Sequence, residues 1–321
     1  MASTPIVIVV DDDESRMSAA TSTVTRTPTD RCDRAHEIIV AVEPVGRLIT
    51  SIEEFCYGFF HMDECFEWKQ NHVCLSKPPN RCPRMLVCAI AHLQVRMSDG
   101  ILATAYVKKY TNEFRGHTEE NLHVEELISQ DTKLHAQIVD AHARIMTVEK
   151  PTVVESKASS SVISAIKLTL YVTYQPCHHS AGGRKLQHSH AKSCTSTILQ
   201  WSRNVLQPFG VDFHFKCCEL YRAHWEDSAL YHLPGDASIY ESRSAQARAG
   251  LQLLQSESAI HIESMTVEDW ALFMSWCDES VCRSITDHQW SIRYAFDKRV
   301  DEFLRRLSDD AKHKPTLSRP P

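Results

Sequence analysis

The sequence lacks the long apolar run of a membrane protein. No stretch approaches the roughly 20 apolar residues that a membrane-spanning helix requires. The run Ile6–Val10 is short, follows no basic residue and precedes three aspartates, so it does not resemble a secretory signal. A composition of 43% hydrophobic and 24% charged residues is ordinary for a globular protein. We therefore expect an intracellular protein, in the cytoplasm, the nucleus or both, with no membrane partner.

The sequence also lacks an excess of positive charge. Its formal net charge is −6 at pH 7, so binding of nucleic acid would require a local basic surface. The twelve cysteines are many, but a chain of 321 residues can bury a sizeable core without disulfide bonds. In a reducing compartment, most of these thiols are expected to be buried as small hydrophobic groups, and a few to bind metal.

The chain divides into one folded domain, residues 47–310, and two tails. Residues 1–46 combine an acidic cluster with a Ser/Thr-rich stretch, which predicts a flexible N-terminal tail; residues 311–321 form the C-terminal one. Hydrophobic periodicity predicts helices over residues 52–60, 122–145, 194–206, 240–254, 267–276 and 288–307, and strands over 85–95, 101–110, 166–174, 211–217 and 259–262. The segment Ser98-Asp99-Gly100 predicts a hairpin turn between the first two strands. This order of elements predicts an α/β fold, a five-stranded mixed sheet with helices on both faces.

Residues suited to metal chemistry stand at predicted helix starts. His123 and Glu125 open one helix, Cys177 follows Pro176 at the end of a buried strand, and Cys194 opens the next helix. A catalytic zinc ion takes three protein ligands from His and Cys and keeps a fourth position for water. A helix N-terminus favours the thiolate that zinc requires, which suits Cys194. His123, Cys177 and Cys194 are the candidate ligands through their resemblance to a known metal-binding signature. Glu125 is the candidate catalytic residue, a proton carrier beside the metal.

These residues resemble, in type and order, the H-x-E…P-C-x-x-C signature of zinc nucleobase deaminases, except for the spacing of the two cysteines. A longer region, about residues 52–276, resembles the AID/APOBEC family of polynucleotide cytidine deaminases. The resemblance is carried by the segments 122–126, 170–177, 215–221, 249–251, 260–262 and 265–266, and by Asp269, Trp270 and Trp276. It implies the cytidine-deaminase fold, a Zn²⁺ cofactor, single-stranded DNA or RNA as partner, and hydrolytic deamination of cytosine to uracil.

The chain departs from the family pattern between the two cysteines. The family has Pro-Cys-x-x-Cys, but Ser180 stands three residues after Cys177, and the next cysteine is Cys194. We assign the third ligand to Cys194 because it opens the next helix, with His188 and His190 as competing nitrogen ligands. The insert between the cysteines, residues 178–193, is basic and has no acidic residue. This composition fits either a phosphate-binding flap or a disordered, solvated loop.

Substrate-binding residues are placed by the resemblance. Tyr174 stands where the family usually has Trp, and Tyr221 matches the aromatic residue that packs on the target cytosine. Arg222 sits where the family selects the preceding nucleotide, and Trp225 is placed to stack on a flanking base. Asn112 matches an asparagine before the catalytic histidine, at a longer spacing than in the family. For Tyr221, Arg222 and Trp225, the alternative is an ordinary packing or solvated role.

Two other functions fit part of this pattern. One is a deaminase of free nucleosides or of tRNA adenosine, against which the loop at Tyr221 and the aromatic Trp270 argue. The other is a non-catalytic nucleic-acid-binding relative, against which the intact Glu125 argues. The sequence does not distinguish DNA from RNA as the substrate.

Overall fold

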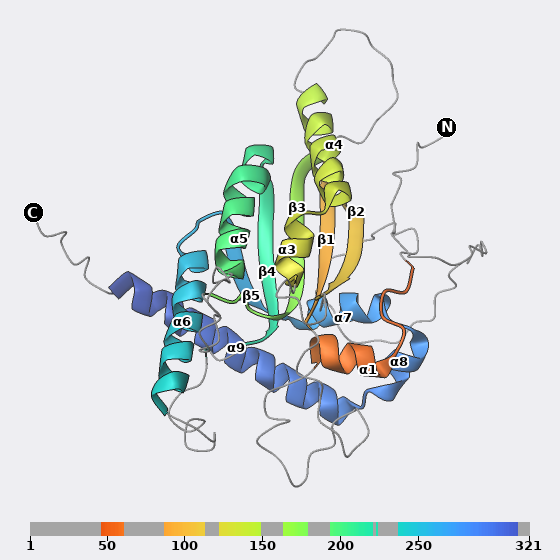
Figure 1. Cartoon of the computed structure of the whole chain (residues 1–321). Coiled ribbons are helices and arrows are strands. Elements are labelled where there is room, and N and C mark those ends of the chain that lie inside the picture. Colours follow the sequence, from red (N-terminus) through yellow and green to blue (C-terminus); the bar gives the residue numbers. More distant parts are fainter. Residues whose placement is uncertain are drawn as a thin grey trace, which may run out of the picture.

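A single β-sheet organises the chain. The computed structural model describes residues 46–60, 87–112, 122–148, 163–178, 193–220, 223 and 237–313. The sheet has the strand order β2-β1-β3-β4-β5 (Figure 1). Its strands are β1 (Cys88–Met97), β2 (Leu102–Thr111), β3 (Ile163–Tyr174), β4 (Val211–Glu219) and β5 (Ile260–Ser264). β1 pairs antiparallel with both β2 and β3, whereas β3, β4 and β5 are parallel. The predicted five-stranded mixed sheet is confirmed.

The hairpin between β1 and β2 turns at the predicted place. Asp99 Oδ1 accepts a hydrogen bond from the Ile101 N–H at 3.0 Å. Gly100 has a φ of 89°, a left-handed conformation that glycine adopts without the steric cost of a Cβ. β3 begins at Ile163 rather than at residue 166, and its apolar run is buried at the centre of the sheet, as expected for a strand covered on both faces.

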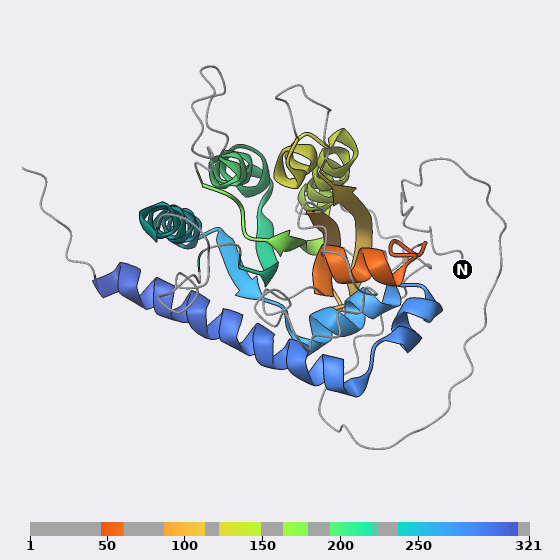
Figure 2. The ribbon, with the colours of Figure 1, turned by 60° about the horizontal axis from the view of Figure 1, so that its bottom comes forward.

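Helices cover both faces of the sheet. Figure 2 shows α4 and α5 on one side, and α1, α7 and α9 on the other. The first side holds α3 (Val124–Ser129), α4 (Thr132–Val148) and α5 (Cys194–Trp201). The second holds α1 (Ile52–Phe55), continued by a π-helical turn (Cys56–Phe60), with α7 (Val267–Ser275) and α8 (Glu279–Ser284). The helix α8 was not predicted from the sequence.

Strand alternation in β4 separates the two hydrophobic cores. Phe213 and Phe215 belong to the core under α3, α4 and α5, whereas Cys218 belongs to the core with Trp270 and Phe273 of α7. Successive side chains of a strand point to opposite faces. The polar residues Asp212, His214 and Lys216 therefore face away from α5. The strand therefore presents apolar side chains to one face of the sheet and these polar side chains to the other.

Two further helices pack beside β5. They are α6 (Ala237–Gln255) and α9 (Asp287–His313), joined by a third core that includes Leu251, Phe296 and Phe303. The helix α9 extends past the predicted domain end at residue 310. Among the described helices, none is both long and apolar enough to cross a membrane.

Two of the predicted helices are divided in the structure. The predicted helix 122–145 breaks before α4, where Asp131 Oδ1 accepts hydrogen bonds from the N–H groups of Lys133 (2.8 Å) and Leu134 (3.0 Å). This is the pattern of a helix N-cap, and it starts a new helix. Of the predicted helix 194–206, only Cys194–Trp201 form the α-helix α5. A π-helical turn (Ser202–Leu206) and a 3₁₀ turn (Gln207–Phe209) follow it.

Candidate metal centre

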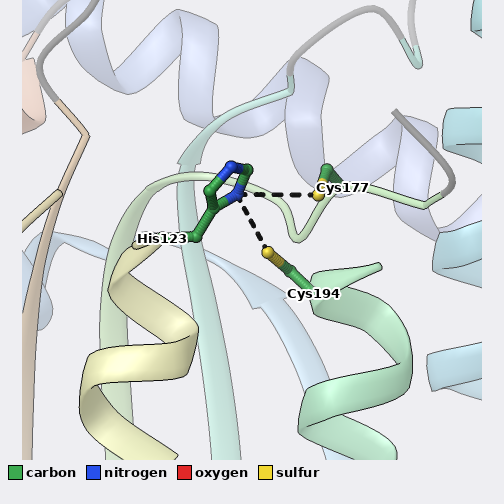
Figure 3. Close-up of side chains that lie close together, drawn as sticks. All are labelled: His123, Cys177 and Cys194. Carbon is green, nitrogen blue, oxygen red and sulfur yellow. Dashed lines mark hydrogen bonds between the residues drawn. The ribbon is translucent and has the colours of Figure 1, made fainter. Parts of the chain in front are cut away.

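Three donor side chains from three segments meet at one point. His123 Nδ1 lies 3.1 Å from Cys194 Sγ and 3.7 Å from Cys177 Sγ (Figure 3). All three donor atoms lie within 4.8 Å of one another. Cys194 is buried, and the other two side chains are half-buried. The structure therefore brings together the three predicted ligands.

Helix starts hold two of these donors. His123 is the N-cap of α3, with extended backbone (φ −79°, ψ 153°), and its N–H donates to Glu126 Oε2 at 2.9 Å. Cys194 is the first residue of α5, whose N-cap Ser193 accepts from the Ser196 N–H at 3.2 Å. Both donors thus lie at helix N-termini, where the backbone amides and the helix dipole stabilise negative charge such as that of a thiolate.

The third donor is held by hydrogen bonds to the start of α5. The Cys177 carbonyl accepts from both the N–H (3.0 Å) and the hydroxyl (3.1 Å) of Thr195. His178 Nδ1 lies 3.2 Å from Ser193 Oγ. Since Thr195 is fully buried, its two bonds are shielded from water. Together with the His178 contact, they fix the loop after β3 against the helix that carries Cys194.

Glu125 lies beside the three-donor group in the first turn of α3. Its side chain is 4% exposed, and burial raises its pKa to about 7; a hydrogen bond with Cys194 acts in the opposite direction. The donor group itself consists of His123, Cys177 and Cys194. The structure thus places Glu125 as predicted, next to the ligands.

The surroundings of the donors shift their pKa values. A hydrogen bond with Cys177 raises the pKa of His123, against the opposing effect of burial. The pKa of the Cys194 thiol is also raised, first by its hydrogen bond with Cys177 and then by burial. A divalent cation reverses this preference for protons, because its charge favours thiolate and neutral imidazole.

The donor set fits a tetrahedral metal ion. With metal–sulfur and metal–nitrogen distances of about 2.3 and 2.0 Å, the ligand atoms of a tetrahedral site are separated by ~3.5–3.8 Å. The contacts of 3.1 and 3.7 Å approach that spacing. One imidazole and two thiols are also donors that borderline-soft divalent ions prefer. The group can therefore hold a metal ion with one position left open.

Two of the predicted substrate residues lie in the described part of the chain. Tyr174 is the last residue of β3, pairs with Glu219 of β4 and is half-buried. Asn112 follows β2, and its Oδ1 accepts from the Val87 N–H at 3.0 Å, which closes the end of the hairpin. Contact of either residue with a substrate stays a prediction. The other residues of this kind lie outside the described residues: Tyr221, Arg222, Trp225, and the competing ligands His188 and His190.

Sequence reasoning missed two residues that shape the site. Thr195 donates from its backbone N–H and its hydroxyl to the Cys177 carbonyl, in the loop after β3 that we call the metal loop (residues 175–178). Gly250 of α6 packs against His178 and Thr195. A glycine inside a helix costs about 1 kcal/mol relative to alanine. Its presence in the middle of α6 was therefore a signal of close packing.

In comparisons with known proteins, no protein-family model matches the chain, and no curated protein matches it significantly.

Proposed function

We propose that the protein is a zinc-dependent deaminase that converts cytosine to uracil in single-stranded nucleic acid. In this proposal, zinc is held by His123, Cys177 and Cys194. The observation that carries it is the buried carboxyl of Glu125 beside a His/Cys/Cys donor group. A structural zinc site has four protein ligands, whereas a catalytic site has three and an adjacent proton carrier.

The chain's own residues would divide the chemistry between them. Bound zinc would supply Lewis acidity, which makes a water molecule nucleophilic near neutral pH. Glu125 takes one proton from the attacking water and delivers it to the ring nitrogen of the base. It then takes the second proton from the hydroxyl added to the ring carbon and passes it to the amino group, which leaves as ammonia. Burial keeps bulk water away from this carboxyl. The N-terminal position of Glu125 in α3 fixes it two residues from the ligand His123.

The polynucleotide substrate is supported by the resemblance of the sequence to the AID/APOBEC family. The net charge of −6 disfavours bulk attraction of a polyanion, so the basic insert 178–193 is the proposed contact with phosphates. Arg222 is the proposed reader of the base that precedes the target. Free nucleosides and tRNA adenosine are the competing substrates, and binding without catalysis is the competing role.

The test measures uracil formation by the zinc-loaded full-length chain. The substrates are single-stranded DNA and RNA oligonucleotides that contain cytosine, with free cytidine and a tRNA adenosine substrate in parallel. We expect turnover of cytosine in at least one oligonucleotide and none of the other two substrates. Glu125→Gln keeps the volume of the side chain but removes its proton transfer. We expect this variant to retain zinc and to lose at least about 10²–10⁴ in rate.

Three results would overturn parts of this proposal. Turnover confined to free cytidine or to adenosine would reject the polynucleotide substrate. A zinc-loaded chain that binds the oligonucleotides but converts none would be a non-catalytic relative. A Glu125→Gln rate close to that of the parent would remove Glu125 from the mechanism.

A further inference from the structure

A second group of metal-ligating side chains lies on the other face of the sheet. It consists of Asp212 and His214 on β4 and His261 on the edge strand β5. One donor atom from each residue lies within 4.8 Å of the others. No local sequence pattern indicates this group, because Asp212 and His261 are far apart in the chain.

Strand register explains why the three residues meet. β4 and β5 are parallel, and His214 pairs directly with His261. Their rings stack with centroids 4.7 Å apart and an interplanar angle of 28°. Asp212 precedes His214 by two residues, so the period of two places it on the same face. That face is opposite to the one on which Phe213 and Phe215 pack below α3 and α5, so this group is separate from the His123 centre.

The donor atoms of these residues converge. Asp212 Oδ2 lies 3.1 Å from His214 Nε2, and Asp212 Oδ1 lies 3.4 Å from His261 Nε2. The two imidazole rings therefore direct the same nitrogen, Nε2, toward one carboxylate. A neutral imidazole nitrogen without a proton is an acceptor, as a carboxylate is. His214 Nε2 and Asp212 Oδ2 are hydrogen-bonded, and a cation that replaces the shared proton would meet three donor atoms directed toward it.

A second carboxylate lies beside the ring of His214. Glu263 Oε1 lies 3.4 Å from His214 Nδ1, on the side of the ring away from Asp212. A carboxylate near the far nitrogen of a metal-bound histidine is an arrangement that recurs in metal sites. The group thus has donors of two kinds and a second carboxylate beside them.

The neighbouring positive charges are those of two lysines. Lys216 Nζ lies 2.5 Å from Asp269 Oδ2 and 3.2 Å from Glu263 Oε2, so its charge is directed to those carboxylates. Lys167 of β3 is the register partner of Asp212. A divalent ion in this position would bind both imidazole nitrogens and the carboxylate together.

We propose that Asp212, His214 and His261 bind a divalent transition-metal ion such as Zn²⁺. Two imidazoles and one carboxylate suit zinc and its neighbours in the first transition row. The Asp212 and His261 side chains are 51% and 49% exposed, so the ion enters from solvent and keeps its remaining positions for water. The bound ion ties the edge strand β5 to β4. This proposal does not depend on the proposed deaminase function.

The test compares metal binding by three full-length proteins at the same buffered concentration of free Zn²⁺. His261→Gln removes one exposed ligand. His288→Gln is the matched control, because His288 is also exposed but lies on α9. After equilibrium dialysis and elemental analysis, we expect His261→Gln to bind one ion fewer per chain than the parent, and His288→Gln to bind as many. The readout is the difference in ions bound per chain between each variant and the parent. Ions bound elsewhere on the chain contribute equally to all three proteins and do not affect this difference.

A second variant and a spectroscopic readout separate ligand loss from misfolding. Asp212→Asn removes the shared carboxylate at an exposed position. With Co²⁺ in place of Zn²⁺, the two thiolates of the His123 centre give a sulfur-to-metal charge-transfer band, which the N/O donors of the second group do not give. The proposal holds if Asp212→Asn and His261→Gln each lose one ion and keep this band at parental strength. It is overturned if either variant binds as many ions as the parent, or if the band is lost with the ion.

Discussion

Gly250 of α6 lies against His178, the residue that follows the candidate metal ligand Cys177. A Cβ added at position 250 would stand 2.6 Å from His178 Cβ and 2.9 Å from Thr195 Oγ1. Carbon atoms in van der Waals contact are separated by about 3.5–4.0 Å, so this space does not accept a methyl group. The helix α6 can approach the metal loop only because residue 250 has no side chain.

We therefore predict that Gly250→Ala weakens both the fold and the metal centre. In a helix interior, glycine to alanine normally stabilises by about 1 kcal/mol; overpacking here reverses the sign and costs about 1–3 kcal/mol. Urea unfolding and competition with a zinc chelator measure the two effects. Gln246→Ala, at an exposed position of the same helix, is the control and should change neither. The double variant Gly250→Ala with His178→Gly should recover part of the lost stability and zinc affinity. If Gly250→Ala is instead more stable than the parent and retains zinc, the metal loop moves to accept the added methyl group.

Cys194→Ala should remove most of the bound zinc from the first centre. Loss of one of three ligands leaves a two-donor site, which is too weak to compete with a chelator. Cys218→Ala is the matched control, because Cys218 is also a buried free cysteine but packs in the other core. Elemental analysis after dialysis against the chelator gives the metal content. If Cys194→Ala keeps its zinc and His190→Ala loses it, the third ligand is a histidine of the insert.

Local patterns were sufficient to predict much of the fold, and the resemblance to a deaminase signature indicated the donors of the first centre. The alternation in β4 and the apolar run of β3 gave strands close to the observed ones. The donors His123 and Cys194 could be placed because each stands at a helix start, a feature that short-range sequence signals indicate.

Features that depend on pairing between distant segments could not be predicted in this way. The Asp212 and His261 group requires the register of β4 against β5, and the contact of Gly250 with His178 requires the position of α6. The break before α4 was missed because the apolar spacing continues across it. What divides the helix is Asp131, whose partners Tyr106 and Tyr110 lie on β2.

Asp131→Ala should destabilise the protein by about 2–4 kcal/mol, because one carboxylate serves two elements. Its Oδ1 caps α4, and its Oδ2 accepts from the hydroxyls of Tyr106 (3.0 Å) and Tyr110 (2.7 Å). Burial raises its pKa, but hydrogen bonds from Leu134 and the tyrosines outweigh this and lower it to about 2. Asp131→Asn keeps an acceptor and should lose less. Asp99→Ala, in the exposed hairpin turn, is the control for urea unfolding at pH 7; an equal effect of the two alanine variants would contradict this role.

His92 should make the stability of the protein depend on pH below about 6.5. Its side chain is 1% exposed; Nε2 lies 2.9 Å from Thr104 Oγ1, and the ring packs edge-on against Trp276. Burial, with the charge of Lys167, lowers its pKa from 6.5 to about 3. Between these two values the unfolded chain binds a proton that the folded chain does not bind. Stability therefore falls as the pH falls, by up to about 1.4 kcal/mol per pH unit, and is unaffected by this group above pH 6.5.

His92→Gln isolates this contribution, because glutamine retains a hydrogen-bonding group for Thr104 but does not titrate. Urea unfolding of the parent and the variant at pH 7.5, 6.5, 5.5 and 5.0 gives two curves of stability against pH. Other carboxylates, histidines and the metal centre titrate in both proteins, so the difference between the curves reports His92. We expect the parent to lose about 2 kcal/mol more than the variant between pH 6.5 and 5.0. The exposed His288→Gln should follow the parent. Parallel curves for the parent and His92→Gln would mean that the folded protein accepts a proton on His92, through an opening of the core between β1 and Trp276.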